Sequence, residues 1–396
     1  MIKVGVIFGG VSVEHEVGII TAVQAMEFMN PKKYEIVPIY ITKEGYWYTS
    51  EKFTNMETFK DLSNIDKIAT KIALVKENNE FALHALNKTF NKTINTIDIA
   101  FPIVHGKGVE DGSLAGFLST LGIPYVGPQM LGASIGQDKV VQKQLLSAEG
   151  INVPNYVWFY DNEWEENENK LIKEIENLNY PVIVKPARLG SSIGITFAKN
   201  KESLIEAVNE AITYDNKVIV EETIKNLQEI DCAVVGNYRY QETAPLGEFQ
   251  TDNNFLTFED KYIGESNKKN PKTSGKISVN GFTIPANLDA KTTKEIEELS
   301  IKAFKILNLS GVTRFDYLVD KETKKIYLNE PNTIPGCLAF FFFKANGKDY
   351  TTLLDEMIAT TVEDYKKEQR RVTNFDSNIL STYENGSGSK NKMNVN

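Results

Sequence analysis

The first part of the chain alternates between short apolar runs and segments whose apolar residues recur at helical spacing. Ile2 to Phe8 reads as a buried strand that runs directly into Gly9 and Gly10. The helix candidates that follow are 16–29 and 112–121, and the strand candidates are 35–41 and 96–104. Such alternation is typical of a parallel sheet covered by helices. We therefore expect a Rossmann-like first domain over residues 1–138.

After residue 138 the pattern becomes mixed, which is typical of smaller α+β units. The predicted helices are 139–148, 201–213, 290–307 and 350–365, and the predicted strands are 181–186, 217–222 and 231–235. We expect a central unit over 139–229 and a C-terminal unit over 230–373. Gln250 to Asn280 is rich in Asn, Lys and Gly, as lids and disordered loops are. The polar residues 374–396 contain nothing that forms a core, so we expect a disordered tail.

Composition narrows the class of protein without naming a function. The chain has 396 residues, of which 41% are hydrophobic, so it can bury a large core spread over two or three domains. Its net charge of −9 argues against a general affinity for nucleic acid or anionic lipid. No run approaches the roughly 20 apolar residues of a membrane span, and we expect a cytoplasmic protein. Cys232 and Cys337 are the two cysteines, and both are expected to be reduced thiols.

Val312 to Gly336 carries the strongest chemical signal in the sequence. Two alternating strands flank a polar turn, so the stretch reads as a β-hairpin. Folding it about the turn places Asp316 opposite Asn329 or Glu330. The amide of Asn332 then lies at the same strand ends, and these oxygen ligands are of the kind that Mg²⁺ accepts when it also holds phosphates. Taken alone, the same residues also fit a solvated hairpin with polar strand ends.

Lys185 ends another predicted strand and is followed by a loop of glycines and small hydroxyl residues, Arg188 to Gly194. Such a loop lets backbone N–H groups approach phosphate oxygens, while Lys185 supplies positive charge. The Gly-Lys-Ser/Thr of a Walker sequence is absent, and a linker or turn fits the same residues. The next predicted strand ends in Glu221 and Glu222, with Glu229 close behind, which alone reads as an acidic strand edge.

Two glycine-rich turns follow strands of the first domain. After the first turn, Glu14 and Glu16 stand at the start of a predicted helix, where acidic side chains also simply offset the helix dipole. His105 begins the second turn at the carboxyl end of a predicted strand, where open α/β sheets bind ligands. We therefore favour a functional role for His105 over a purely structural one.

Taken together and in this order, six separated motifs make the chain resemble the D-alanine:D-alanine ligase family of the ATP-grasp superfamily. They are GGVSVEHEV from Gly9, HGKGVEDG from His105, QDK ending at Lys139, VKPARLGSSIG from Val184, EDKY from Glu259, and RFDYLVD from Arg314 with NEPNTIPG from Asn329. The resemblance covers roughly residues 2–365. It implies α/β and α+β architecture, with a Rossmann-like N-terminal domain followed by a two-part ATP-grasp fold. It also implies an enzyme that makes D-alanyl-D-alanine for peptidoglycan.

The resemblance assigns roles to particular residues. It implies two Mg²⁺ ions, replaceable by Mn²⁺, at Asp316, Glu330 and Asn332. The residues implied for ATP are Lys139, Lys185, the loop Arg188 to Gly194 with Ser192, then Glu221, Glu222, Ile224 and Glu229, and Lys261 on the lid loop. The residues implied at the reacting groups are Glu14, His105, Ser191, Tyr262, Arg314 and Gly336.

The reaction implied by the resemblance passes through an acyl phosphate. Glu14 would bind the ammonium of the first D-alanine, and His105 would lie beside the carboxylate that ATP activates. The amine of the second substrate would then attack, with Arg314 and the N–H of Gly336 stabilising the oxyanion. Ser191 and Tyr262 would link the phosphate loop to the lid. ATP and D-alanine are the expected partners, with a homodimer formed through the first domain.

The chain departs from the family pattern after Gly336. The family has hydroxyl residues here, but Cys337 to Phe343 reads CLAFFFF, and Phe341 stands where a serine that helps to hold the second D-alanine is expected. The phenylalanines fit either a core under the hairpin or a larger, apolar second pocket. The acceptor therefore stays open between D-alanine, D-serine, another amino acid and a hydroxy acid. A non-catalytic nucleotide-binding module, which would lack some of the ligands above, is the alternative from a different class.

Overall fold

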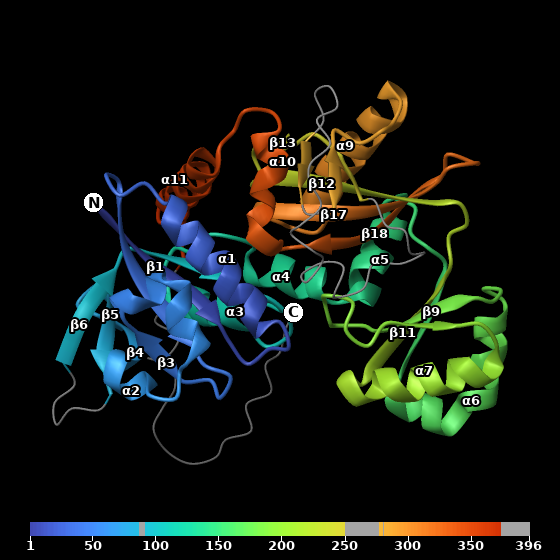
Figure 1. Ribbon diagram of the computed structural model, residues 1–396, viewed down its shortest axis with the longest axis horizontal. Coiled ribbons are helices and arrows are strands. Elements are labelled where there is room, and N and C mark those ends of the chain that lie inside the picture. The colour runs from blue at the N-terminus through green and yellow to red at the C-terminus, as the bar shows by residue number, and fades with distance from the viewer. Residues whose placement is uncertain (87–91, 250–276, 280, 374–396) are drawn as a thin grey trace, which may run out of the picture.

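Figure 1 shows the computed structural model of the protein, which describes residues 1–86, 92–249, 277–279 and 281–373. Lys261, Tyr262, nearly all of the predicted lid and the predicted tail lie outside the described residues. Three sheets follow one another along the chain. The first lies at one end of the molecule, and the other two lie toward the opposite end (Figure 1).

The first sheet has seven strands in the order β6-β5-β4-β3-β2-β1-β7. They are β1 (Ile2–Gly9), β2 (Tyr34–Ile41), β3 (Trp47–Thr49), β4 (Thr70–Glu77), β5 (Glu80–Ala85), β6 (Lys92–Ile97) and β7 (Ile99–Ile103). The predicted parallel pairing is confirmed for β2, β1 and β7. The remaining strands extend the sheet by antiparallel pairing, which the sequence analysis missed.

The single strand predicted over 96–104 is wrong, because the structure has two strands there. β6 ends at Ile97 and β7 begins at Ile99, with Asp98 between them. The Asp98 N–H donates to the Lys3 carbonyl at 2.8 Å, and its carboxylate accepts from the Lys3 N–H at 2.7 Å. These bonds tie the connection to the start of β1.

The helices of the first domain include the predicted pair, now α1 (His15–Phe28) and α3 (Ser113–Leu121). The shorter elements are η1 (Glu51–Thr54), η2 (Met56–Lys60), α2 (Ile65–Ile68) and α4 (Met130–Gln137). Gly9 has a φ of +85°, and a Cβ there would lie 2.3 Å from the Ile41 carbonyl oxygen. Only glycine fits this turn, which leads from β1 to Glu14 at the N-terminus of α1.

The middle part of the chain forms an antiparallel sheet with helices on its outer face. Its strands are β8 (Tyr156–Tyr160), β9 (Val182–Pro186), β10 (Thr196–Ala198) and β11 (Lys217–Glu222), in the order β10-β9-β11-β8. The helices on this face are α6 (Asp161–Glu176) and α7 (Lys201–Tyr214), whereas α5 (Lys139–Ala148) precedes the sheet and packs against α4. Asp138 caps α5 by accepting from the N–H groups of Val140 and Val141. The sequence predicted α5 and β11 correctly but missed β8 and α6.

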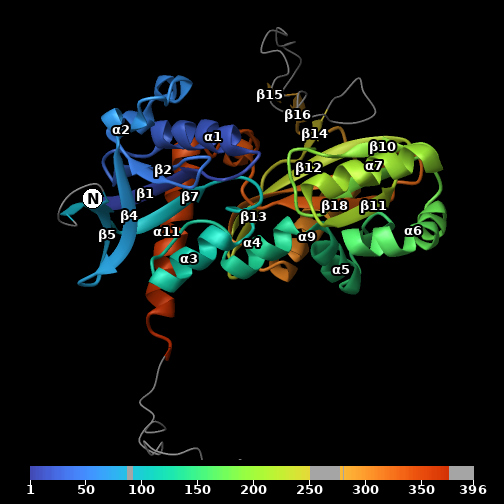
Figure 2. The ribbon, with the colours of Figure 1, turned by 90° about the horizontal axis from the view of Figure 1, so that it is seen from below.

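The last part of the chain builds the third sheet and returns to the first. The strands are β12 (Leu227–Gly236), β13 (Gln241–Thr243), β14 (Gly247–Phe249), β15 (Ile277–Val279), β16 (Phe282–Ile284), β17 (Gly311–Asp320) and β18 (Ile326–Asn332). The helical elements are α9 (Ala290–Ile306), η3 (Gly336–Ala339), α10 (Phe340–Lys344) and α11 (Tyr350–Glu368). Tyr350, Leu353 and Leu354 of α11 join the hydrophobic core of the first sheet. Figure 2 shows α11 beside that sheet.

The predicted hairpin is confirmed, together with its register. β17 and β18 pair antiparallel, and Asp316 lies opposite Glu330. A β-bulge between Asp316 and Tyr317 shifts the register at that point. The two carboxylates therefore stand side by side on neighbouring strands of the hairpin.

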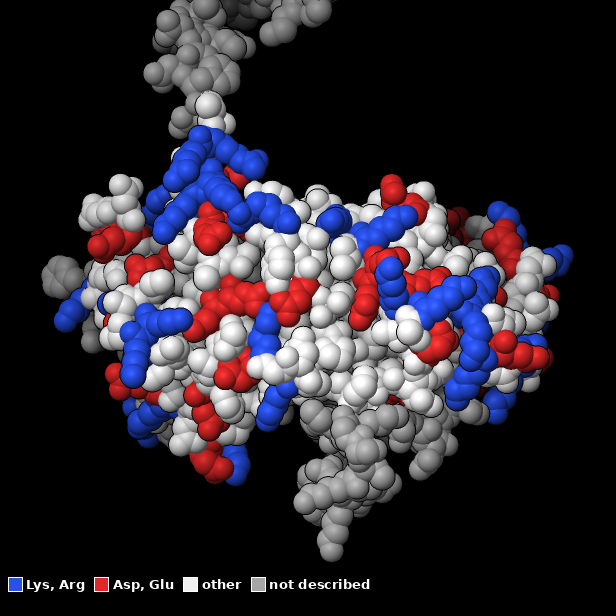
Figure 3. Space-filling view, turned by 90° about the horizontal axis from the view of Figure 1, so that it is seen from above, with Lys and Arg blue, Asp and Glu red and all other residues white. Residues whose placement is uncertain are grey.

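The surface seen in Figure 3 carries basic and acidic side chains that are interspersed. A group of basic residues gathers where the described chain ends, and α11 has Lys366 and Lys367 in its last turn. In the described part of the chain, no helix combines the length and apolarity that a membrane span requires.

Candidate active site

One cavity, with a volume of about 2060 Å³, is lined by residues from all three parts of the chain. Single ligands usually occupy roughly 300–1000 Å³, so this cavity has room for more than one. The predicted site residues that line it are Glu14, His105, Lys139, Lys185, Ser191, Ser192, Glu222, Ile224, Glu229, Arg314, Asp316, Glu330, Asn332 and Gly336. Glu221 lies behind the wall, and Lys261 and Tyr262 lie outside the described residues.

Carboxylates of the third sheet surround Arg314. The Arg314 guanidinium donates to both oxygens of Asp316, at 2.8 and 2.9 Å, and its Nε lies 2.9 Å from Asp231. Asp231 is on β12 directly opposite Asp316. Asp231 was not among the predicted site residues, although a charged residue inside the apolar strand 230–235 was a signal for it. Arg314 thus offsets part of the negative charge that gathers here.

Two lysines reach toward these carboxylates from the middle part of the chain. Lys139, the first residue of α5, places Nζ 3.0 Å from Glu330 and 2.6 Å from the Leu189 carbonyl oxygen. Burial alone lowers the pKa of Lys139, but the surrounding carboxylates, Glu330 foremost, outweigh it and raise the pKa. Lys185, on β9, donates to Glu221 at 2.8 Å. Lys139 and Lys185 therefore form a cationic wall of the cavity, which faces the carboxylates of Asp316 and Glu330.

A buried charge cluster lies behind this wall. Lys143, one helical turn after Lys139, has its Nζ 3.3 Å from Glu221 and donates to the Asn329 carbonyl at 2.7 Å. Burial lowers the pKa of Lys143 to about 8. Burial alone raises the pKa of Glu221, but Lys143 and Lys185 hold it below its usual value. The sequence analysis missed Lys143, for which the spacing of four residues from Lys139 was the available signal.

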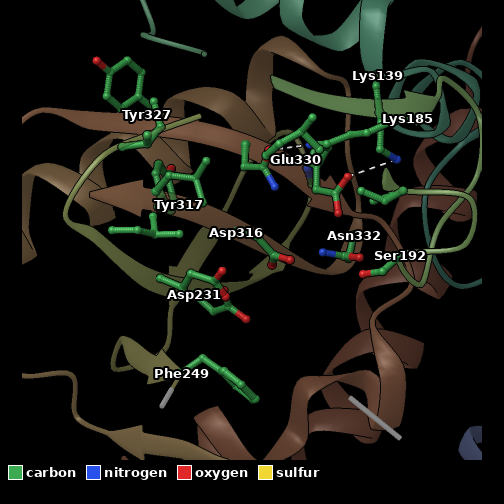
Figure 4. Close-up of a pocket in the computed structure, with 18 of the residues that line it drawn as sticks. Lys139, Lys185, Ser192, Asp231, Phe249, Asp316, Tyr317, Tyr327, Glu330 and Asn332 are labelled. Carbon is green, nitrogen blue, oxygen red and sulfur yellow. Dashed lines mark hydrogen bonds and ion pairs between the residues drawn. The ribbon is translucent and has the colours of Figure 1, made fainter. Parts of the chain in front are cut away.

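The predicted metal ligands fit a divalent cation by their chemistry. In Figure 4, Asp316, Glu330 and Asn332 point toward the same space. Their two carboxylates and one amide are hard ligands that leave room for phosphate oxygens. Asn332 Nδ2 is a donor that is buried without a hydrogen-bond partner in the described part of the chain, so it can donate to an acceptor such as a phosphate oxygen while Oδ1 would serve the cation. Within the same residues, no group of three His, Cys, Asp or Glu forms a metal site by itself.

Glu14 occupies a tight enclosure next to the cationic wall. Ser191 Oγ donates to its carboxylate, so the first domain and the loop after β9 meet here. A Cβ added to Gly190 would lie 2.8 Å from Glu14 Oε2, and one added to Gly106 would lie 2.6 Å from it. A side chain at either position would therefore push the Glu14 carboxylate out of its present place.

His105 and Glu110 lie deeper in the cavity. Burial lowers the pKa of His105 to about 4, so the imidazole is neutral at pH 7. Glu110 accepts from the Gly106 N–H at 2.9 Å and from Thr333 Oγ1 at 2.8 Å. Burial, and secondarily the charge of Glu14, raises the pKa of Glu110 to about 7. Glu110 belongs to the HGKGVEDG motif, but the sequence analysis gave it no role.

Arg188 does not face the cavity, although it belongs to the predicted phosphate loop. Its guanidinium pairs with Asp215, at 2.5 Å from Oδ1. The residues of this loop that line the cavity include Gly190, Ser191 and Ser192. Ser191 and Ser192 have φ values of 52° and 60°, a left-handed conformation that is uncommon outside glycine. The glycines and serines of the loop, rather than Arg188, therefore present the surface for a ligand.

An aromatic wall closes the side of the cavity near Gly336. Phe249, Phe282 and Phe341 all line it. The ring of Phe341 is centred 5.7 Å from that of Phe282 and 4.6 Å from that of Phe342. Phe341 is 6% exposed. It therefore packs in the core and also forms part of the cavity wall.

The middle and third sheets border one cavity in which Lys139 and Lys185 lie opposite Asp316 and Glu330, and this arrangement is that of an ATP-grasp enzyme. Family models place the chain further. The model for the D-ala D-ala ligase N-terminus matches residues 3–128, and the model for the D-ala D-ala ligase C-terminus matches residues 145–359. The chain belongs to the D-alanine–D-alanine ligase family and is an ATP-dependent ligase.

Individual relatives agree with this placement along nearly the whole chain. The D-alanine–D-alanine ligase of Thermosipho melanesiensis is 39% identical over 382 residues, covering 96% of this chain and 98% of that protein. Among solved structures, the VanG D-Ala:D-Ser ligase of Enterococcus faecalis matches with a TM-score of 0.75 and 33% identity, covering 91% and 99%. The Bacillus anthracis D-alanine–D-alanine ligase complexed with ATP matches with a TM-score of 0.64 and 26% identity, covering 93% and 100%.

Proposed function

We propose that the protein joins two D-alanine molecules in an ATP-dependent reaction that yields D-alanyl-D-alanine, ADP and phosphate for peptidoglycan synthesis. The observation that carries the proposal is the placement of Lys139 and Lys185 opposite Asp316, Glu330 and Asn332 in the cavity that also holds Glu14. An ammonium-binding carboxylate, a phosphate-binding wall and a cation site thus share one space.

ATP would lie between the middle and third sheets. Lys139, Lys185 and Ser192 would bind its phosphates, because their positive charge and donors face the cavity. Glu222, Ile224 and Glu229 line the far part of the cavity and would contact adenine and ribose. Glu221 would act through Lys185, since it lies behind the wall and its carboxylate accepts a hydrogen bond from Lys185 Nζ at 2.8 Å. Lys261 is proposed to close over the nucleotide from the lid.

Asp316, Glu330 and Asn332 would hold two Mg²⁺ ions, for which Mn²⁺ is the proposed substitute. When bound, the ions would neutralise negative charge on the phosphates. Arg314 and Lys139 now offset the charge of the same carboxylates, at 2.8 Å from Asp316 and 3.0 Å from Glu330. Both side chains would then be available to the reacting groups.

The residues of the chain support a two-step reaction. Glu14 would hold the ammonium of the first D-alanine, with Ser191 and, from the lid, Tyr262 fixing that carboxylate. The carboxylate of the first D-alanine would attack the γ-phosphate, break its bond to the β-phosphate oxygen so that ADP leaves, and form an acyl phosphate beside His105. The second amine would attack its carbonyl carbon, and phosphate would leave. Arg314 and the Gly336 N–H would stabilise the oxyanion, each donor contributing about 10²–10³ in rate.

A ligase with a different acceptor is the second candidate, and the aromatic wall favours it. Phe341 places a ring, without a hydroxyl, on the side of the cavity near Gly336. A related fold is known from a D-Ala:D-Ser ligase, the VanG protein of Enterococcus faecalis. The acceptor would then be D-serine, another amino acid or a hydroxy acid, with D-alanine kept as the first substrate.

One experiment separates the two candidates. The enzyme is supplied with ATP, Mg²⁺ and D-alanine, alone and with a panel of acceptors, and the products are identified by mass. D-alanyl-D-alanine formed with D-alanine alone, at a rate that no added acceptor exceeds, supports the first candidate. If an added acceptor gives a mixed product at a higher rate, the second candidate is supported and the first is not. Absence of any product, with ATP intact, removes both and favours a nucleotide-binding module.

We also propose domain boundaries, a cellular location and an oligomeric state for the enzyme. We take residues 1–138, 139–229 and 230–373 as the three functional units, with 374–396 as a tail. ATP and free D-alanine are cytoplasmic metabolites, so we place the enzyme in the cytoplasm. We further propose a homodimer formed through the first domain, with no nucleic-acid or membrane partner.

A further inference from the structure

The segment after β18 is held by side chains of the first domain. Thr333 Oγ1 and the Ile334 N–H both donate to Glu110 Oε1, at 2.8 and 3.1 Å. The Cys337 N–H donates to Thr21 Oγ1 at 3.2 Å. Hydrogen bonds from the first domain therefore hold Thr333 to Cys337, the segment that follows the proposed cation site.

Thr21 lies at a point where three segments meet. It is on α1 and is 1% exposed. Besides the Cys337 N–H, its Oγ1 lies 3.3 Å from His105 Nε2. A backbone N–H can only donate, so the Thr21 oxygen accepts from Cys337. The hydroxyl proton of Thr21 is then available to His105.

The protonation of His105 fixes the direction of that second bond. Burial keeps the imidazole neutral, with a pKa lowered to about 4, so the ring carries one N–H. Because the Thr21 oxygen already accepts from the Cys337 N–H, its own proton can be directed at Nε2, and we assign the ring N–H to Nδ1. Nε2 then accepts from Thr21 and is not left to exchange a proton with substrate.

The turn beside Thr21 has an unfavourable backbone conformation, which neighbouring groups must stabilise. Cys337, Leu338 and Ala339 have φ values of 53°, 48° and 49°, which is left-handed backbone. Three successive non-glycine residues in this conformation are unfavourable and persist only where neighbouring groups fix them. Thr21 binds the first of the three, directly after Gly336.

We propose that Thr21 is a positioning residue for the ligase reaction, in which its hydroxyl joins His105 to the Cys337 backbone and so fixes the direction of the Gly336 N–H. This inference rests on the proposed function, since it assigns the Gly336 N–H to the oxyanion. Thr21 itself does not line the cavity and does not touch substrate.

The test compares substitutions of nearly equal volume. Thr21→Val removes the hydroxyl and keeps the shape, whereas Thr21→Ser keeps the hydroxyl. Thr313→Val is the matched control, because Thr313 is also fully buried but its hydroxyl has no hydrogen-bond partner in the described part of the chain. Thermal unfolding of each variant is recorded, so that loss of folded protein is distinguished from loss of turnover.

The kinetic result expected is a split between kcat and KM. Thr21→Val lowers kcat by about ten- to a hundredfold, as misplaced catalytic donors do, and leaves the KM for ATP unchanged. Thr21→Ser and Thr313→Val keep the wild-type kcat. The role of Thr21 is overturned if folded Thr21→Val keeps its kcat, or if folded Thr21→Ser loses as much as Thr21→Val.

A second measurement does not depend on activity. The chain has three histidines, His15, His84 and His105, so ¹⁵N imidazole spectra can be assigned by single substitutions. His105 should be a neutral Nδ1–H tautomer, and its Nε2 resonance should shift in Thr21→Val but not in Thr21→Ser. An unshifted Nε2 overturns the hydrogen-bond assignment. If the spectra agree but the wild type ligates no amino acid, the hydrogen bonds of Thr21 stand, whereas the proposed function and the positioning role of Thr21 in it both fail.

Discussion

The ammonium group of Lys139 lies 3.0 Å from the carboxylate of Glu330, across the gap between α5 and β18. ATP phosphates would compete with Glu330 for this ammonium, so Lys139→Met should weaken ATP binding. A hydrogen bond to a charged group contributes about 1.5–3 kcal/mol, and we expect the KM for ATP to rise at least about tenfold. Initial rates of phosphate release measure this. Lys302→Met on the exposed face of α9 is the control, and an unchanged KM in Lys139→Met would remove Lys139 from the phosphate site.

Gly190→Ala should disturb the first D-alanine site and spare ATP. The new Cβ would lie 2.8 Å from Glu14 Oε2, so the carboxylate must move. Gly190 does not have a positive φ, and backbone strain therefore does not confuse the result. We expect the KM for D-alanine to rise at least about tenfold, the loss of one charge-assisted contact. The control is Gly116→Ala in α3, where the new Cβ would meet only the flexible and exposed Met130, and the KM for D-alanine should not change. Equal effects of the two variants would contradict the assignment of Glu14 to the first D-alanine.

Glu110→Gln should change how stability depends on pH. Burial, with the charge of Glu14, raises the pKa of folded Glu110 from 4.5 to about 7. The stability that Glu110 contributes is therefore present below pH 4.5 and lost as the pH rises through about 7. The free energy of unfolding, measured with urea, should fall more between pH 5 and pH 8 in the wild type than in Glu110→Gln. Glu298→Gln on the surface should follow the wild type, and parallel behaviour of Glu110→Gln would show that Glu110 is ionised throughout.

Phe341→Tyr tests where the acceptor binds. The substitution keeps the ring against Phe282 and adds a hydroxyl donor to the cavity wall. A donor that reaches the acceptor carboxylate should lower the KM of the second D-alanine by up to about tenfold and leave the KM for ATP unchanged. Phe342→Tyr is the contrasting variant, because Phe342 is fully buried and its new hydroxyl would mainly destabilise the fold. An acceptor KM that does not respond to Phe341→Tyr would place the second subsite elsewhere.

The fold was predictable where local pattern decides structure. The helix over 139–148 and the strand over 217–222 agree with α5 and β11 to the residue, because a capping aspartate or a continuous apolar run marks them. The antiparallel strands β3, β4 and β5 were missed, and the end of β6 was merged with β7 in one predicted strand. Short, half-exposed strands show only weak hydrophobic periodicity and gain their stability from neighbouring strands of the sheet. The return of α11 to the first domain is a tertiary contact that no local pattern encodes.

The candidate site was predictable where residues are adjacent in one hairpin. Asp316 and Glu330 follow from the register of β17 and β18 alone. Asp231 and Lys143 were missed because each acquires its place only through a neighbouring element, β17 for Asp231 and Glu221 of β11 for Lys143. Thr21 is on the buried face of α1, where a threonine reads as an ordinary core residue.

The central claim is that ATP activates the carboxylate of D-alanine by phosphorylation, and isotope transfer tests it most directly. D-alanine labelled with ¹⁸O in both carboxyl oxygens is incubated with the enzyme, ATP and Mg²⁺, and the released phosphate is analysed by mass. Formation and attack of an acyl phosphate should move one ¹⁸O atom into inorganic phosphate for each dipeptide formed. Dipeptide formed together with unlabelled phosphate, or with the label in AMP, would contradict the account.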